Sequence, residues 1–294
     1  MPEPNAPVTT SPLLALIRLT RPWNVLMIGA AMWVFFVRLL DVPLADHGWA
    51  VLAMAAAAAA GNVINDYFDV REDRVNKPRR ALVGRVVKRR IALATHHVLS
   101  GMALFAAGYG AWQMQACWPL IYMVVLGGAL AAYSPFFKRS FLRGNLLIAF
   151  AVGQLPLWAG GVVGTEDERL WQVLMGYAAL SFWLTLVREI TKDLQDAEGD
   201  ARWGSDTLAV RWERIRTVRL LHGLLALGAL GLGTAATWWW GQIGVPASWC
   251  MAFLLPYFAG WVTLRNGDVT RLSAWLKLSL AGGLVALAAA PPLA

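Results

Sequence analysis

Two clusters of carboxylates in this sequence share one internal spacing. The first lies within residues 62–73 and the second within 189–200, and both contain the pattern D-x-x-D-x-x-x-D. Offsets of three and seven residues place such carboxylates along one face of a helix. The members are Asp66, Asp69 and Asp73 in acidic motif 1, and Asp193, Asp196 and Asp200 in acidic motif 2. Six carboxylates that converge would repel one another, which predicts a cation between them.

Magnesium is the ion that fits this pattern best. Mg²⁺ takes oxygen ligands and usually binds through a few carboxylates together with substrate phosphates and water. The two motifs are therefore predicted to act as two Mg²⁺-binding arms that hold a diphosphate, with nearby Lys and Arg neutralising the leaving group. Two solvated helix ends are one alternative. A cation-transporter site is another, although its acids would be expected deeper in a bilayer.

The composition indicates a membrane protein. Hydrophobic residues make up 58% of the 294 residues and charged residues only 15%, against roughly 25% in soluble domains. The mean hydropathy is +0.51. So few charges cannot coat a soluble globule of this size, which excludes disordered, fibrous and nucleic-acid-binding classes despite the net charge of +8. The two Cys exclude a disulfide scaffold and a thiolate metal cluster.

Nine apolar stretches approach the ~20 residues that a membrane-spanning helix needs. They cover residues 16–37, 48–66, 91–112, 117–134, 145–163, 170–187, 220–240, 246–264 and 272–290. Residues 1–12 are polar and are predicted to be a disordered tail. Residues 13–294 are predicted to form a single all-α transmembrane domain, in which the two acidic motifs are a pseudo-repeat.

The distribution of cations predicts the orientation of this bundle. Of the 26 Lys and Arg, 21 follow the second, fourth, sixth or eighth stretch, and two more, Arg18 and Arg21, lie at the start of the first, which makes 23 on one side. Only Arg38 and Arg169 fall in the other connections, and Lys277 lies within the ninth stretch. Lys and Arg concentrate in cytoplasmic loops. We therefore expect a multi-pass protein of the inner or plasma membrane, with its N-terminus and both acidic motifs on the cytoplasmic side and its C-terminus outside.

Four segments together resemble the UbiA-type intramembrane prenyltransferases. Residues 65–78 (N-D-Y-F-D-V-R-E-D-R-V-N-K-P) resemble the first family signature, and residues 192–200 (K-D-L-Q-D-A-E-G-D) resemble the second. Residues 133–139 (Y-S-P-F-F-K-R) resemble the Tyr…Lys segment after the fourth helix, and residues 21–24 (R-P-W-N) the opening motif. The likeness spans essentially the whole chain. It implies a nine-helix UbiA-type bundle with the active site at the cytoplasmic mouth and Mg²⁺ as cofactor.

The resemblance also implies roles for individual residues. The metal ligands would be Asn65, Asp66, Asp69, Asp73, Asp193, Asp196 and Asp200. The diphosphate would contact Asn65, Lys77, Arg79, Lys138, Arg139 and Lys192. Catalysis would rest on Asp66, Asp69, Asp193, Asp196, Lys138 and Tyr133, with Tyr133 near the reacting carbon. The substrate cavity would be lined by Arg21, Asn24 and Asn62.

Within the family, both motifs resemble those of the digeranylgeranylglyceryl phosphate synthases. That branch moves a geranylgeranyl group from its diphosphate to the hydroxyl of geranylgeranylglyceryl phosphate. The chlorophyll-synthase branch has a similar second motif, and residues 82–85 (L-V-G-R) stand where many relatives have a Pro-rich, Ser-Gly stretch. An aromatic or chlorophyllide acceptor therefore stays open. A cation transporter or a lipid-binding subunit is the non-enzymatic alternative, but a transporter has no need of Lys138 and Arg139 beside the acids.

Overall fold

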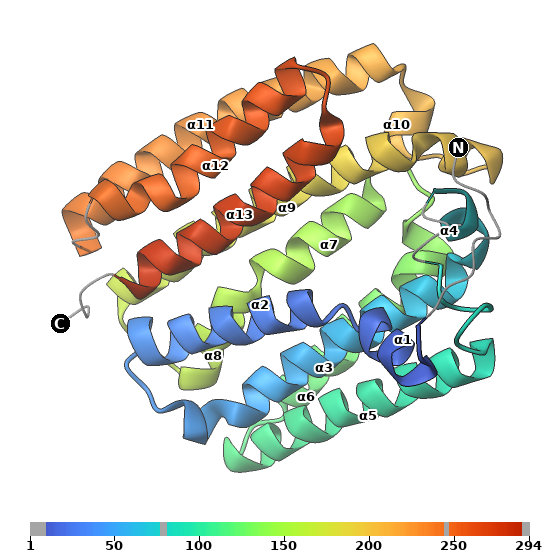
Figure 1. Cartoon of the computed structure of the whole chain (residues 1–294). Coiled ribbons are helices and arrows are strands. Elements are labelled where there is room, and N and C mark those ends of the chain that lie inside the picture. Colours follow the sequence, from blue (N-terminus) through green and yellow to red (C-terminus); the bar gives the residue numbers. More distant parts are fainter. Residues whose placement is uncertain (1–9, 77–80, 244–246, 290–294) are drawn as a thin grey trace. The chain divides into compact units, whose positions relative to one another are not determined.

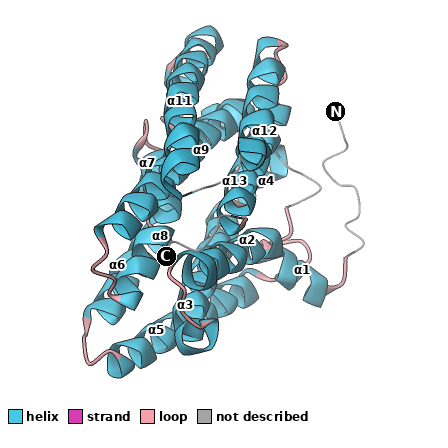
Figure 2. Cartoon of the chain, turned by 90° about the vertical axis from the view of Figure 1, so that its left-hand side faces the viewer, coloured by secondary structure: helices cyan, strands magenta, loops and turns pink. Residues whose placement is uncertain are grey.

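The computed structural model describes residues 10–76, 81–243 and 247–289, which contain helices and no strand (Figures 1 and 2). The α-helices are α1 (Pro12–Leu19), α2 (Pro22–Trp33), α3 (Leu44–Phe68), α4 (Val70–Asn76), α5 (Arg89–Gln113), α6 (Trp118–Ala132), α7 (Arg143–Gly153), α8 (Leu155–Val163), α9 (Glu168–Arg202), α10 (Leu208–Arg211), α11 (Arg214–Ile243), α12 (Ala247–Arg265) and α13 (Val269–Ala288). Two π-helical turns, η1 (Val34–Leu39) and η2 (Tyr133–Phe137), extend α2 and α6. The predicted all-helical architecture is confirmed.

Eight helical segments of the described chain are long and apolar enough to cross a membrane. They are Pro22–Leu39, Leu44–Phe68, Arg89–Gln113, Trp118–Phe137, Arg143–Val163, Glu168–Arg202, Arg214–Ala235 and Val269–Ala288. Each overlaps one of the nine stretches predicted from the sequence. The remaining stretch, 246–264, overlaps α12, whose apolar part Cys250–Arg265 is shorter than these eight segments.

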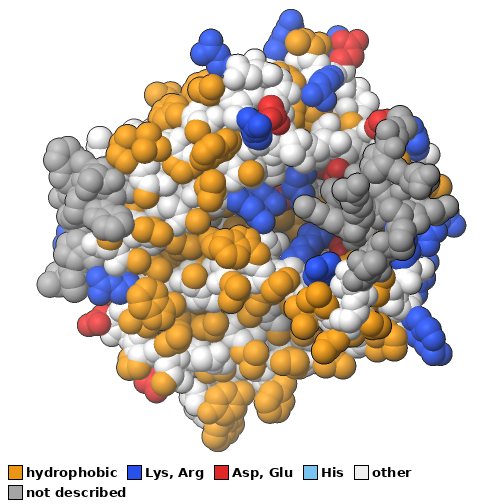
Figure 3. All heavy atoms as spheres, viewed as in Figure 1, with side chains coloured by type: hydrophobic (Ala, Val, Ile, Leu, Met, Phe, Trp, Pro, Cys, Tyr) orange, Lys and Arg blue, Asp and Glu red, His pale blue; other side chains and the backbone are white. Residues whose placement is uncertain are grey.

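Large apolar side chains are exposed along these helices. Phe105 is 79% exposed, Phe136 75% and Leu230 70%. Figure 3 shows hydrophobic side chains spread over the face of the molecule that it displays. Water would not tolerate so much exposed apolar surface, whereas lipid tails do. The chain is an integral, multi-pass membrane protein.

The helices belong to two compact units, each described here by itself. The first holds the described residues of Met1–Gly29, His47–Ser140 and Glu198–Ser205, and the second those of Ala30–Asp46, Phe141–Ala197 and Asp206–Ala294. The sequence predicted a single domain over residues 13–294. Helix α9 is continuous, but its residues up to Ala197 belong to the second unit and those from Glu198 to the first.

In the first unit, α3 packs closely against α5. A Cβ added at Gly110 of α5 would lie 2.3 Å from the ring of Trp49 on α3, so only glycine permits this approach. A tight turn over residues 82–87 packs against α1, because Leu82 and Val83 are buried in one cluster with Ala15 and Leu19 of that helix. At its tip Gly84 has a φ of +78°, which favours glycine. The residues that replace the family's Pro-rich stretch therefore form a packed turn.

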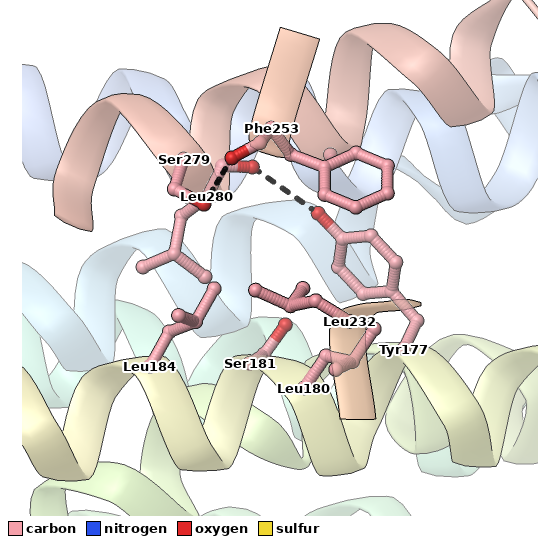
Figure 4. Close-up of a pocket in the computed structure, with 9 residues that line it drawn as sticks. Tyr177, Leu180, Ser181, Leu184, Leu232, Phe253, Ser279 and Leu280 are labelled. Carbon is pink, nitrogen blue, oxygen red and sulfur yellow. Dashed lines mark hydrogen bonds between the residues drawn. The ribbon is translucent and has the colours of Figure 1, made fainter. Parts of the chain in front are cut away.

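In the second unit, α13 lies against α12, and α12 against α11 (Figure 1). A Cβ at Gly282 of α13 would lie 1.9 Å from the Ala252 carbonyl oxygen, so glycine allows the two backbones to meet. Figure 4 shows a small cavity beside this contact, lined by Tyr177 and Ser181 of α9 and by Ser279 of α13. The Ser279 hydroxyl donates to the Phe253 carbonyl over 2.8 Å. This cavity, of about 20 Å³, holds no more than a water molecule.

Candidate active site

Acidic motif 1 lies where α3 ends and α4 begins. The Asp69 N–H donates to the Asn65 carbonyl over 3.0 Å, and the Asp73 N–H donates to the Asp69 carbonyl over 2.8 Å. Both bonds have the four-residue spacing of an α-helix, so the turn at Asp69 leaves these residues on one side of the chain. The Asn65 amide donates to Asp69 Oδ2 over 2.7 Å and accepts from the Ser134 hydroxyl over 3.0 Å. The predicted carboxylate stripe is thus fixed by local hydrogen bonds.

The segment that carries Lys138 is a π-turn. Pro135 has no N–H, so the helical bond to the residue four positions earlier cannot form there. The wider turn of η2 accommodates this, and the Lys138 N–H donates to the Tyr133 carbonyl, five residues earlier, over 2.7 Å. Single π-turns in long helices occur frequently at functional sites. The turn sets the direction in which Lys138 leaves the end of the span.

Lys138 lies among the carboxylates of motif 1. Its Nζ donates to Asp69 Oδ2 over 2.5 Å, and the Asp69 side chain is only 5% exposed. Burial raises the pKa of the Asp69 carboxyl, against the opposing effect of the Lys138 ammonium. Burial alone would lower the pKa of Lys138, but Asp69, Asp73 and Asp200 raise it above its usual value. Asp200, the last carboxylate of motif 2, therefore acts on the same ammonium as motif 1.

A strained backbone position brings a second cation to motif 1. Where the sequence predicted one helix over 16–37, the chain breaks between α1 and α2 at Arg21, whose φ is +54°. A residue before proline disfavours the α conformation, and the left-handed region costs a non-glycine residue about 1–2 kcal/mol. The Arg21 guanidinium donates to Asp66 Oδ1 over 2.8 Å, and the Asn62 amide donates to the Thr20 carbonyl over 3.0 Å. Strain of this kind concentrates at functional sites.

The next ion pair, between Arg139 and Glu72, was not anticipated from the sequence. Arg139 Nη2 donates to Glu72 Oε1 over 2.5 Å. Glu72 is 5% exposed, and its Oε2 is buried without a hydrogen-bond partner among the described residues. A signal existed in the sequence: Glu72 is three residues beyond Asp69 and so lies on the same face. Glu72 fixes the direction of a guanidinium that was predicted to bind diphosphate.

Glu72→Gln is expected to raise the KM for the prenyl diphosphate about tenfold. Mutating a residue that orients a ligand-binding group typically lowers affinity or activity by roughly 10–100-fold. The amide keeps the size of the side chain but no longer holds Arg139 by charge. Steady-state kinetics with varied prenyl diphosphate would measure this. Asp206→Asn, which breaks the exposed pair with Arg211, is the matched control and should leave KM unchanged. An unchanged KM in Glu72→Gln would contradict the positioning role.

In the second unit, α9 carries the rest of motif 2. The Asn145 amide of α7 donates to Asp193 Oδ2 over 2.8 Å, and Asn145 is 6% exposed. Lys192 Nζ contacts Glu189 Oε2 over 2.7 Å, and Arg188 contacts Glu189 Oε1 over 2.9 Å. Lys192, predicted to bind diphosphate, is thus held by a carboxylate one turn away. Asn145 was missed, since no local pattern links it to a residue 48 positions later.

The other predicted residues fall into three groups. The Asn24 N–H donates to the Arg21 carbonyl over 2.8 Å in the first turn of α2. Tyr133 and Asp196 are half-buried on η2 and α9. Lys77 and Arg79 lie outside the described residues. The structure thus brings Arg21, Asn62, Asn65, Asp66, Asp69, Asp73, Lys138, Arg139 and Asp200 into one unit, and Asp193, Asp196 and Lys192 into the other.

The donor atoms of motif 1 fit a hard divalent ion. Asp66, Asp69, Asp73 and the amide of Asn65 offer oxygen ligands, the kind that Mg²⁺ prefers. Asp66 is paired with Arg21 and Asp69 with Lys138. Among the described residues, no three His, Cys, Asp or Glu side chains are grouped closely enough to hold a metal ion. Arg21 and Lys138 thus neutralise two carboxylates whose charge a bound metal would also neutralise.

Known proteins are similar to this chain over nearly its full length. Digeranylgeranylglyceryl phosphate synthase from Methanoregula boonei is 31% identical, over 91% of this chain and 94% of the relative. The enzyme of that name from Natronomonas pharaonis is 32% identical, over 92% and 94%. The fold is similar to a solved structure from work on digeranylgeranylglyceryl phosphate synthase in membranes, with a TM-score of 0.66, 21% identity and coverage of 94% and 97%.

A UbiA homologue from Archaeoglobus fulgidus, solved bound to DMAPP and Mg²⁺, has a similar fold as well. Its TM-score is 0.63 at 19% identity, over 92% of this chain and 98% of that protein. The model of the UbiA prenyltransferase family matches residues 24–281. That match covers both acidic motifs and the Lys138 segment. On these grounds, the chain belongs to the UbiA prenyltransferase family.

Proposed function

We propose that this chain transfers a geranylgeranyl group from its diphosphate to the free hydroxyl of geranylgeranylglyceryl phosphate. The observation that carries the proposal is the position of Lys138, whose ammonium donates to the buried Asp69 carboxylate of motif 1 over 2.5 Å. A cation paired in this way is suited to a site that exchanges an ion pair for a metal and a diphosphate. The family membership and the two 31–32% identical relatives support the same reaction.

The metal ligands of the proposal are the oxygens of both motifs. Asn65, Asp66, Asp69 and Asp73 would hold Mg²⁺ in motif 1, and Asp193, Asp196 and Asp200 in motif 2. When bound, Mg²⁺ neutralises the charge that develops on a diphosphate leaving group. Asn145 orients Asp193 for this task through the hydrogen bond to Oδ2. The Cd²⁺-bound and Mg²⁺-bound UbiA homologues support a divalent ion.

The proposal also assigns roles to the cations near the motifs and to Tyr133. Lys138 and Arg139 bind the diphosphate, aided by Lys77, Arg79 and Lys192. The allylic C–O bond breaks and its electron pair leaves with the diphosphate. The acceptor hydroxyl oxygen then forms the new C–O bond, and its proton passes to the released diphosphate. The ring of Tyr133 stabilises the allylic cation, while Arg21, Asn24 and Asn62 line a cavity from which water is excluded.

The proposal includes a topology. Nine spans, with α12 as the eighth in sequence, would place the N-terminus and both motifs on the cytoplasmic side and the C-terminus outside. The concentration of Lys and Arg in alternate connections supports this arrangement. A long prenyl tail would then lie among the spans while its diphosphate stays at the polar mouth.

The test is an assay with labelled geranylgeranyl diphosphate and Mg²⁺ in detergent or membranes. Geranylgeranylglyceryl phosphate, 4-hydroxybenzoate and a chlorophyllide are offered separately, each with an EDTA control. Label should enter the glycerol ether. EDTA should abolish the transfer, because without a divalent ion the charge on the diphosphate leaving group is not neutralised and the C–O bond does not break. Transfer to an aromatic or chlorophyllide acceptor instead would overturn the proposed acceptor. Absence of transfer to all three by folded protein would overturn the proposed reaction.

A further inference from the structure

A groove lies between α11 and α12, in the second unit, and takes no part in the proposed reaction. It encloses about 640 Å³ and is lined by His222, Phe258, Trp261, Val262 and Arg265. Sites for small ligands span roughly 300–1,000 Å³. His222 lies near the start of α11, and Arg265 is the last residue of α12. The groove therefore opens at the basic ends of two membrane-facing helices.

One wall of the groove presents a fixed hydrogen-bond donor. Trp261 Nε1 donates to His222 Nδ1 over 2.9 Å, so Nδ1 acts as the acceptor of the ring. A neutral imidazole that accepts at Nδ1 carries its proton on Nε2. The bond thus leaves an N–H on His222 for a ligand in the groove. Phe258 stacks on Trp261, with ring centroids 6.3 Å apart, and holds the indole in place.

Beside this donor, the groove presents an uncompensated cation, Arg265, one helical turn after Trp261 on α12. Arg265 is exposed and makes no hydrogen bond or salt bridge with any residue that the structure describes. The acid that follows it one turn later, Asp268, is already paired with Arg271 over 3.1 Å. Among the described residues, no carboxylate lines the groove. Arg219, exposed on α11 one turn before His222, adds positive charge to the same face of that helix.

The remaining wall is apolar and faces lipid. Phe258 is 45% exposed and Val262 53% exposed. Tryptophan is enriched at the membrane–water boundary because its ring is apolar and its N–H is polar. An occupant must therefore combine an anionic, hydrogen-bond-accepting head with a hydrocarbon chain. A guanidinium and an N–H donor suit phosphate oxygens.

From these contacts we propose that the groove binds an anionic phospholipid of the surrounding membrane. The phosphate contacts Arg265 and His222 Nε2, and one acyl chain lies along Phe258 and Val262. Basic pockets between membrane helices bind anionic headgroups, and each Lys or Arg near the surface contributes about 1 kcal/mol. None of the residues that line the groove belongs to either acidic motif, and the proposal does not depend on the proposed reaction.

The test is native mass spectrometry of the full chain in detergent, titrated separately with dioleoylphosphatidylglycerol and dioleoylphosphatidylcholine. Phosphatidylglycerol should bind more tightly, and Arg265→Gln should weaken it about fivefold. Arg216→Gln is the matched control, because it removes the same charge from another face of α11 and should change the affinity less than about twofold. Val262→Trp, which fills the groove, should reduce binding of phosphatidylglycerol while Arg265 is still present.

Three results would overturn the proposal. The first is equal binding of the two lipids by the unmodified chain, and the second is equal loss of phosphatidylglycerol in Arg265→Gln and Arg216→Gln. The third comes from a further titration with geranylgeranylglyceryl phosphate. If that lipid displaced phosphatidylglycerol from the unmodified chain but not from Arg265→Gln, the groove would be an acceptor site instead.

Discussion

Asp69→Asn is expected to lower the rate of prenyl transfer by at least about 10²-fold, the loss typical when one charge-stabilising group is removed from an active site. Asp69 is the most enclosed carboxylate of motif 1, with a side chain that is 5% exposed and that accepts from both Lys138 and Asn65. The amide keeps the shape of the residue but loses a negative ligand. The measurement is single-turnover transfer at saturating Mg²⁺ and prenyl diphosphate.

The control for this variant is Glu198→Gln. Glu198 lies in motif 2, but its side chain is 73% exposed and, among the described residues, pairs only with the exposed Arg202 of α9. Exposed pairs of this kind contribute little, about 0–1 kcal/mol. Glu198→Gln should therefore transfer label at the rate of the unmodified chain. If the two variants lost activity equally, the effect would reflect the charge of the motifs in general, and the specific role of Asp69 would be refuted.

The sequence predicted what depends on regular spacing. Each of the eight apolar segments follows from a stretch that is long enough to span lipid. The stripe of Asn65, Asp69 and Asp73 follows from helical periodicity, and the four-residue bonds through Asp69 preserve it. Lys138 was predicted from the resemblance, and the structure places its ammonium against Asp69. The spans and the stripe are local features, so one segment of sequence contains the information they need, whereas the pairing of Lys138 with Asp69 joins residues 69 positions apart.

What the sequence did not predict depends on contacts between distant segments or on local strain. The hydrogen bond from Asn145 to Asp193 joins two helices, and the sequence of neither helix indicates that the two residues meet. In the sequence, Glu72 is one more acidic residue near a helix end. The structure shows that its side chain is buried and paired with Arg139. The predicted stretch 16–37 runs through Pro22, whereas the structure breaks between α1 and α2 just before this residue. The left-handed φ of Arg21 shows that proline chemistry outweighed periodicity there.

Lys138→Met is expected to abolish detectable transfer, through a loss of at least about 10²-fold, and also to destabilise the metal-free fold. Lys138 is the cation against the buried Asp69 carboxylate, so its removal leaves that charge without a partner. Removing one member of a buried pair is more destabilising than removing both. The double variant Asp69→Asn/Lys138→Met should therefore recover thermal stability relative to Lys138→Met while staying inactive.

The comparison of these variants separates a structural role from a catalytic one. Thermal unfolding in EDTA reports on the ion pair, and inhibition of transfer by inorganic pyrophosphate reports on diphosphate binding in variants that retain turnover. Lys138→Arg keeps the charge and should keep the stability, yet its planar group cannot reproduce the compact ammonium beside Asp69, so its affinity for pyrophosphate should fall. If the double variant regained both stability and activity, the pair would serve only the fold, and diphosphate binding would have to be assigned to Arg139 and the other cations.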